Sequence, residues 1–163
     1  VIGTASREAT GDWVRQLGAH HVVDHHGDLQ AQVRAVAPQG IDYALSLTRS
    51  EQHYAAIVEL LKPQGRLGLI DDPAEPLDIR LLKPKSLSLH WESMFTRPVF
   101  RTEDMIAQHR LLGEVADLVD AGVLRSTLRE HLGPINAANL REAHRRIESG
   151  STIGKLVLGG FDG

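Results

Sequence analysis

Val1-Ile2-Gly3-Thr4-Ala5-Ser6-Arg7 is the segment from which the organisation of the whole chain can be interpreted. Its first five residues are small, apolar or β-branched, which favours a short strand. A hydroxyl and a guanidinium follow, just before a segment of helical periodicity from Ala9 to Leu17. Because ligands bind at the carboxyl ends of strands in open parallel α/β sheets, Ser6 and Arg7 occupy a candidate binding position.

The pair Ser6 and Arg7 predicts a contact to phosphate. A guanidinium donates two parallel hydrogen bonds to phosphate, and at the second strand of a dinucleotide-binding sheet it suits a ribose 2′-phosphate. A 2′-hydroxyl would require Asp or Glu, and neither occupies these two positions. The alternative is that Ser6 caps the next helix and Arg7 is a solvated surface charge.

Composition narrows the class of protein. The chain has 163 residues, the usual size of one domain, so we expect a single domain over 1–163. With a net charge of -3 and only 4% aromatic residues, it lacks the basic surface and stacking residues of a nucleic-acid binder. The absence of cysteine excludes disulfides and fits a cytoplasmic location. No run approaches about 18 apolar residues, so no membrane span is expected, and no signal peptide is recognised.

Apolar periodicity predicts alternating strands and helices. The expected extended segments are Val1 to Ala5, His21 to Asp24, Ile41 to Leu47, Arg66 to Ile70, Ser86 to Trp91, Leu128 to Leu132 and Lys155 to Leu158. The expected helices are Ala9 to Leu17, Asp28 to Val36, Glu51 to Leu61, Glu103 to Ala121 and Asn136 to Ile147, with a helical turn at Ile79 to Leu82. This alternation predicts right-handed crossovers and a parallel α/β sheet.

Short polar residues mark the expected helix starts. Asp28 and Asn136 are predicted N-caps, and Thr48 and Ser50 are candidate caps for the helix from Glu51. Lys62-Pro63-Gln64-Gly65 is predicted to form a turn before the fourth strand.

Seven segments, in this order and spacing, also point to one family. They are Val1 to Arg7, Leu17 to His25, Leu60 to Arg66, Ser86 to Arg97, His131 to Asn139, Ile147 to Gly150 and Gly154 to Leu158. Through them the sequence resembles the coenzyme-binding domain of the medium-chain dehydrogenase/reductase superfamily, in its quinone-oxidoreductase-like or zinc-type alcohol dehydrogenase-like branch. The resemblance implies an α/β fold with a Rossmann-like doubly wound parallel sheet.

In that family a first strand and a Gly-rich turn precede the position of Val1. We therefore expect a sheet truncated before its second strand, with residues 1–163 forming a partial NAD(P)-binding domain that ends in a return strand. The strand order 3-2-1-4-5-6 of a dinucleotide fold makes the first strand central. The strands at Val1 and His21 should then form one group, and those at Ile41, Arg66 and Ser86 a second group without bonds to the first.

The resemblance also implies roles in binding NADPH. Ser6 and Arg7 match positions that hold the 2′-phosphate, and His25 matches one beside the adenosine phosphate. Contacts to adenine and its ribose are implied for Ser46, Leu47 and Thr48, and contacts to the nicotinamide ribose for Ile70, Asp71 and Asp72. The segment beside the nicotinamide is Met94, Phe95 and Thr96, and Lys155 lies in the closing strand. No catalytic residue is implied within the chain.

Two polar groups have alternative interpretations. Asp71 and Asp72 precede Pro73, which is also ordinary turn chemistry. The pairs His20-His21 and His25-His26 invite a metal site, but His21 and His25 on a regular strand would lie roughly 13 Å apart. No metal site is expected.

The function implied is the coenzyme-binding portion of an NADPH-dependent oxidoreductase that transfers hydride to or from a carbonyl or activated alkene of a small-molecule substrate. The isolated chain is expected to be inactive. A homodimer is expected through the edge strand Ser86 to Trp91. Two alternatives remain open: a non-catalytic binding or dimerisation module of the same fold, and a methyltransferase-like α/β domain.

Overall fold

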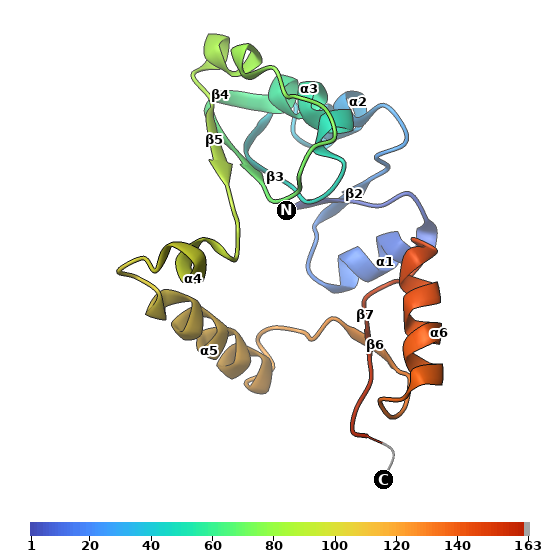
Figure 1. Ribbon diagram of the computed structural model, residues 1–163. Coiled ribbons are helices and arrows are strands. Elements are labelled where there is room, and N and C mark those ends of the chain that lie inside the picture. The colour runs from blue at the N-terminus through green and yellow to red at the C-terminus, as the bar shows by residue number, and fades with distance from the viewer. Residues whose placement is uncertain (162–163) are drawn as a thin grey trace. The chain divides into compact units, whose positions relative to one another are not determined.

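The computed structural model describes residues 1–161 of the chain (Figure 1). The chain divides into two compact units, Val1–Met105 and Ile106–Gly163. The assignment of 1–163 to one domain stays a prediction. No helix among the described residues is long and apolar enough to cross a membrane.

The first unit alternates strands and helices in the predicted order. Its strands are β1 (Ile2–Thr4), β2 (His21–Val23), β3 (Ile41–Ser46), β4 (Leu61–Leu69) and β5 (Ser88–Trp91). Its helices are α1 (Glu8–Gln16), α2 (Leu29–Val36), α3 (Ser50–Leu60), the 3₁₀ helix η1 (Ile79–Lys85) and α4 (Thr96–Phe100). The sequence did not predict α4, and η1 is longer than the expected helical turn.

The strands of the first unit form two separate parallel sheets. One contains β1 and β2, and the other has the order β3-β4-β5. This confirms the predicted α/β class, its parallel pairing and the division of the five strands into two groups. Within the described residues, β1 and β3 each have one edge without a paired strand.

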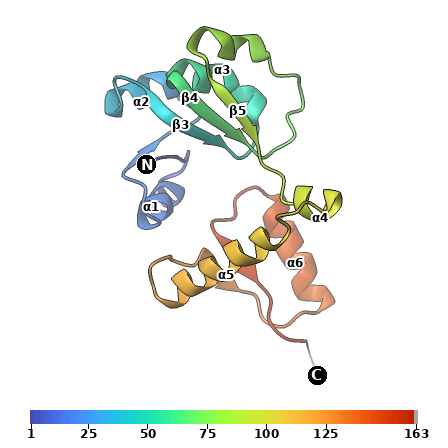
Figure 2. The ribbon, with the colours of Figure 1, turned by 90° about the vertical axis from the view of Figure 1, so that its left-hand side faces the viewer.

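The core lies on the face of the three-stranded sheet that α3 covers (Figure 2). Leu67 and Leu69 on β4 are completely buried and pack in one cluster with Tyr54 and Val58 of α3. Leu45 of the neighbouring strand β3 pairs with Gly68, between these two leucines, so its side chain points to the opposite face of the sheet. On that face Leu45 is 65% exposed.

A second cluster joins the two sheets. Val33 of α2 packs with Val23 of β2 and Leu60 of α3, and Ile2 and Ile41 lie against this cluster. On the opposite side, α1 approaches β1 so closely that a Cβ at Gly3 would collide with Val14. Gly3 is therefore required by packing and not by a turn.

Two of the predicted caps are confirmed. The Asp28 carboxylate accepts a hydrogen bond from the Ala31 amide at the start of α2, and the Asn136 side chain accepts one from the Asn139 amide. The prediction for α3 was wrong: its N-cap is Arg49, whose backbone is left-handed and whose side chain makes no capping bond. The carboxylate that binds the first residue of α3 belongs to Asp71, which follows β4.

The carboxyl end of α3 is also hydrogen-bonded by a residue far from it in sequence. The Lys85 ammonium, at the end of η1, donates to the carbonyl oxygens of Val58, Glu59 and Leu61 at 3.1, 2.7 and 3.0 Å. These carbonyls belong to the last turn of α3 and the residue after it, where helix carbonyls have no intrahelical partner. A cation there is also favoured by the helix dipole.

The predicted turn before β4 is a bulge inside an irregular strand. Ile41 pairs with Leu61 and Tyr43 pairs with Arg66, so the register shifts between them. Gln64, in this bulge, has a left-handed φ of 65°.

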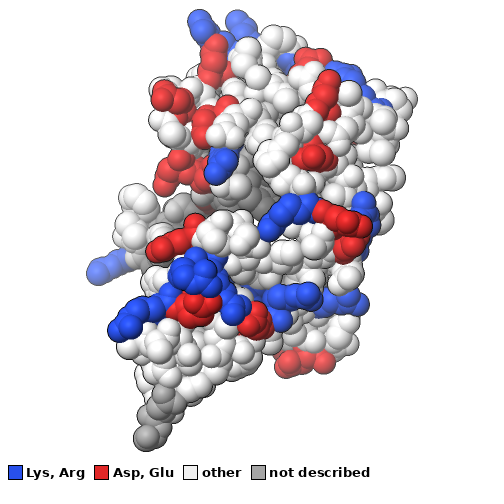
Figure 3. Space-filling model, turned by 90° about the vertical axis from the view of Figure 1, so that its right-hand side faces the viewer, with Lys and Arg blue, Asp and Glu red and all other residues white. Residues whose placement is uncertain are grey.

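The second unit contains α5 (Ile106–Asp120), β6 (Leu128–His131), α6 (Ala137–Glu148) and β7 (Lys155–Val157), with β6 and β7 parallel. The Glu142 carboxylate accepts hydrogen bonds from Arg145 and Arg146, and Arg146 also pairs with Glu130 of β6 at 2.7 Å. Basic and acidic side chains are similarly interspersed over the face drawn in Figure 3.

The unpaired strand edges predict uneven protection of the backbone. We expect amide hydrogen exchange to be fastest within Val1 to Ala5 and Ile41 to Leu47, because amides on an open edge exchange without breaking a ladder bond. Exchange measured by NMR should leave Leu67 and Leu69 of β4 much slower. Slow exchange of both segments in a dilute, pure monomer would contradict the open edges.

Glu142 predicts an acid transition in the second unit. Hydrogen bonds from Arg145 and then Arg146 lower the pKa of Glu142 from its ordinary 4.5 to about 2. Since the folded pKa is depressed, the stabilisation is complete above pH 4.5 and is lost as the pH falls toward 2. The amide signals of α6, followed by NMR against pH, should show this loss.

Glu142→Gln should remove that component of the acid transition, whereas Glu148→Gln, which changes an exposed carboxylate of the same helix, should leave it in place. An unchanged transition in Glu142→Gln would show that another group governs it.

Candidate functional site

The residues predicted to bind coenzyme in the first unit all lie at or just after the carboxyl ends of parallel strands. Ser6 and Arg7 follow β1, His25 follows β2, and Ile70 and Asp71 follow β4. The other predicted residues are Ser46, at the end of β3, Leu47 and Thr48 after it, and Met94, Phe95 and Thr96 after β5. Parallel pairing therefore places the carboxyl ends of β3, β4 and β5 at one edge of their sheet.

A hollow of about 450 Å³ opens beside the ends of β1 and β2. Ser6 and Arg7 line it together with Arg15 of α1, so one hydroxyl-bearing and two guanidinium-bearing residues are among its lining residues. Asp24 and Asp12 line it too, and Asp12 pairs with Arg15 at 3.0 Å. Ser6 is not the cap of α1, because the N-cap position is Arg7 in an extended conformation without a side-chain capping bond.

The loop after β2 is held by Gln32 of α2. Its side chain accepts a hydrogen bond from the Asp24 amide and donates one to the Asp24 carbonyl, at 2.8 and 2.9 Å. These two hydrogen bonds to the backbone of Asp24 fix the end of the strand. The loop that carries His25 begins at that fixed residue.

His25 lies among other imidazoles. Its ring centroid is 4.6 Å from that of His26 and 6.1 Å from that of His53 on α3. Burial, and next the His26 ring, lower the pKa of His25. Its Nδ1 atom is buried without a hydrogen-bond partner among the described residues. His25 therefore lies between the end of β2 and the first turns of α3.

The ends of β3 and β4 are joined by a hydrogen-bond network. The Oγ atoms of Ser46 and Ser50 lie 2.7 Å apart, and the Ser50 hydroxyl donates to Asp71 Oδ1. The Ser50 amide donates to Asp71 Oδ2 at 3.0 Å. Both serines are buried, Ser50 completely. The bond from the Ser50 hydroxyl, followed by that from its amide, lowers the pKa of Asp71.

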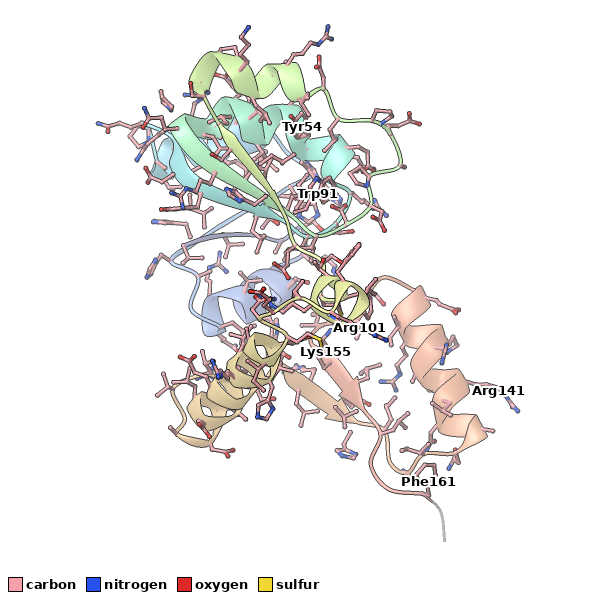
Figure 4. The ribbon with its side chains drawn as sticks, turned by 60° about the vertical axis from the view of Figure 1, so that its left-hand side comes forward. Tyr54, Trp91, Arg101, Arg141, Lys155 and Phe161 are labelled. Atoms are coloured by element: carbon pink, nitrogen blue, oxygen red, sulfur yellow. The ribbon has the colours of Figure 1, made fainter. Side chains whose placement is uncertain are left out.

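The remaining predicted residues are exposed. Met94 and Phe95 are 65% and 64% exposed in the segment that leaves β5, near Trp91, which Figure 4 shows at the end of that strand. Thr96 begins α4. Lys155 belongs to β7 of the second unit, where Figure 4 labels it.

A zinc site is not formed by the described part of the chain. Within residues 1–161 no three His, Cys, Asp or Glu side chains are grouped so that they could hold a metal ion. A catalytic zinc takes three such ligands from the protein.

Several residues of the site were not found by sequence reasoning. Gln32, Arg49 and His53 carry no signal by themselves, because they are polar residues at ordinary helix positions. Ser46 was predicted as a binding residue and Ser50 as a candidate cap, but their hydrogen bonds to each other and to Asp71 were not predicted.

Residues 17–158 match the family model of the zinc-binding dehydrogenases. The chain belongs to this family. It is 36% identical over 158 residues to a zinc-type alcohol dehydrogenase-like protein of Staphylococcus epidermidis, and the match covers 97% of the chain and 47% of that relative. A Staphylococcus aureus protein of the same description is 35% identical. The chain thus spans about half the length of these relatives.

Solved structures agree. A candidate zinc-dependent alcohol dehydrogenase from Rhizobium etli has 52% identity and a TM-score of 0.93, covering 99% of this chain and 47% of its own. A mycobacterial protein solved in complex with NADPH has 24% identity and a TM-score of 0.77, which shows the shared fold. These matches confirm the resemblance to medium-chain dehydrogenases drawn from the sequence and support an oxidoreductase domain.

Proposed function

We propose that the chain is the coenzyme-binding portion of an NADPH-dependent oxidoreductase that transfers hydride to or from a carbonyl or activated alkene of a small molecule. The observation that carries the proposal is the hollow at the end of β1, where Ser6, Arg7 and Arg15 are brought together. A hydroxyl and guanidinium groups can donate hydrogen bonds to a phosphate group. Neither Ser6 nor Arg7 has a carboxylate that could accept a hydrogen bond from a ribose hydroxyl.

The family supports the class of reaction. The relatives are described as alcohol dehydrogenases or alcohol dehydrogenase-like proteins, and one structural neighbour was solved with NADPH. When bound, a nicotinamide coenzyme supplies or accepts the hydride. The residues of this chain would bind and orient it.

The chemistry at each strand end suits a different part of such a coenzyme. Arg7 would neutralise the 2′-phosphate, and Ser6 would donate or accept a hydrogen bond beside it. Leu47 and Ile70, 57% and 48% exposed at the ends of β3 and β4, offer apolar surface to rings. Exposed apolar side chains at strand ends have lower free energy once a ligand covers them.

We also propose that the intact protein is a homodimer formed through β5. This strand is at the edge of its sheet, so one row of its backbone groups is unpaired within the described residues. Trp91, Phe95 and Phe100 near it are 57%, 64% and 76% exposed. An edge strand flanked by exposed aromatic residues favours pairing with a second copy across a two-fold axis.

Arg7→Ala tests the choice of coenzyme. Isothermal titration should show that the unaltered chain prefers NADPH to NADH, and the substitution should narrow that preference by roughly tenfold or more, because charge-assisted hydrogen bonds are worth about 1.5–3 kcal/mol. Arg141→Ala, which removes an exposed guanidinium from α6 (Figure 4), should leave it unchanged.

Equal affinity for NADPH and NADH in the unaltered protein would count against the proposed phosphate contact. Binding of S-adenosylmethionine in place of either coenzyme would favour the methyltransferase-like alternative. Binding of none of the three would favour a module without coenzyme.

Leu89→Pro tests the dimer. Proline lacks the amide donor and disrupts an edge strand, so sedimentation equilibrium should show a larger dissociation constant, with the dimer already dissociating at higher protein concentrations than in the unaltered chain. Leu89 also packs against the main core, so circular dichroism must show that the variant remains folded. An unaltered chain that sediments as a monomer at high micromolar concentration would rule out the proposed pairing.

A further inference from the structure

The network at the ends of β3 and β4 uses both oxygens of one carboxylate. Asp71 Oδ1 accepts from the Ser50 hydroxyl and Asp71 Oδ2 accepts from the Ser50 amide. Ser50 is the first residue of α3 and is completely buried, so its amide and hydroxyl lie out of solvent. The carboxylate thus takes the place of the missing side-chain cap of α3.

The same network encloses a short loop. Leu47, Thr48 and Arg49 lie between Ser46 and Ser50, whose hydroxyls are hydrogen-bonded to each other. Leu47 is more than half exposed, and Arg49 has a left-handed backbone with φ 51°. A residue other than glycine keeps that conformation only where its surroundings hold it.

We propose that Asp71 is a positioning residue that holds the loop 47–49 in its binding conformation through Ser50 and Ser46, and does not itself contact the ligand. This rests on the proposed function insofar as the loop is taken to receive a nucleotide. The physical basis is that Ser46, at the carboxyl end of β3, and Asp71, after the carboxyl end of β4, are both hydrogen-bonded to Ser50 at the start of α3. Loss of the tie frees the loop while leaving the strands paired.

Two substitutions of Asp71 separate positioning from direct contact. Asp71→Ala removes both acceptors. Asp71→Asn keeps one side-chain oxygen that accepts from the Ser50 backbone amide. Its side-chain NH₂ can donate to the Ser50 hydroxyl, provided that this hydroxyl then donates to the Ser46 hydroxyl. Glu75→Gln changes an exposed carboxylate in the same connection and is the matched control.

The first readout is local and needs no ligand. In Asp71→Ala the Ser50 amide should exchange about tenfold faster or more, and the ¹⁵N order parameters of Leu47 to Arg49 should fall from about 0.85 to below about 0.6. Exchange at Leu67 and Leu69 should not change. Asp71→Asn should restore most of the rigidity. An unaltered loop in Asp71→Ala, or equal acceleration at Leu67 and Leu69, would overturn the proposal.

The second readout is titration with NADPH. Asp71→Ala should weaken binding by about tenfold, and Asp71→Asn should recover it. Equal weakening in both variants would show that the charge of Asp71 itself contacts the ligand, which overturns positioning. If the unaltered chain binds no nucleotide, the proposed function fails for this chain, and the local readout still decides whether Asp71 holds the loop.

Discussion

The burial of Leu67 and Leu69 on β4 is the constraint on which the first unit depends. Within the described residues β4 is the one strand hydrogen-bonded on both sides, to β3 and to β5. Burying each leucine is worth about 1.5–3 kcal/mol relative to leaving it exposed. Because side chains alternate along a strand, a shift by one residue would expose both leucines and bury Arg66. The face that β4 presents to the core follows from this.

The parallel register of β3 and β4 determines what can happen at the carboxyl edge. With Ser46 beside Leu69, the residues that follow β3 and β4 emerge next to each other. Ser50 and Asp71 can then bond, although neither is placed there by its own neighbours in sequence. The site is therefore a product of strand pairing, and its preorganisation depends on buried polar groups that are fully paired.

The two sheets of the first unit supply different kinds of side chain at their strand ends. The end of β1 supplies hydroxyl and guanidinium chemistry, while the ends of β3 and β4 supply exposed leucine and isoleucine side chains. Polar and apolar surfaces at separate strand ends are what a ligand with a charged part and ring systems requires. The fold alone would not specify this function, since many α/β sheets share the topology.

Local periodicity, together with caps such as Asp28 and Asn136, was enough to predict the order of the elements other than α4, the parallel class and the carboxyl ends of the strands. The residues at the strand ends, Ser6 and Arg7 among them, could be named for the same reason. Only the tertiary structure decided how α3 is bound at its two ends. Asp71 lies 21 residues from Ser50, and Lys85 lies 24 from Leu61. Bonds across such separations exist only after β3, β4 and η1 have packed, so no local pattern announces them.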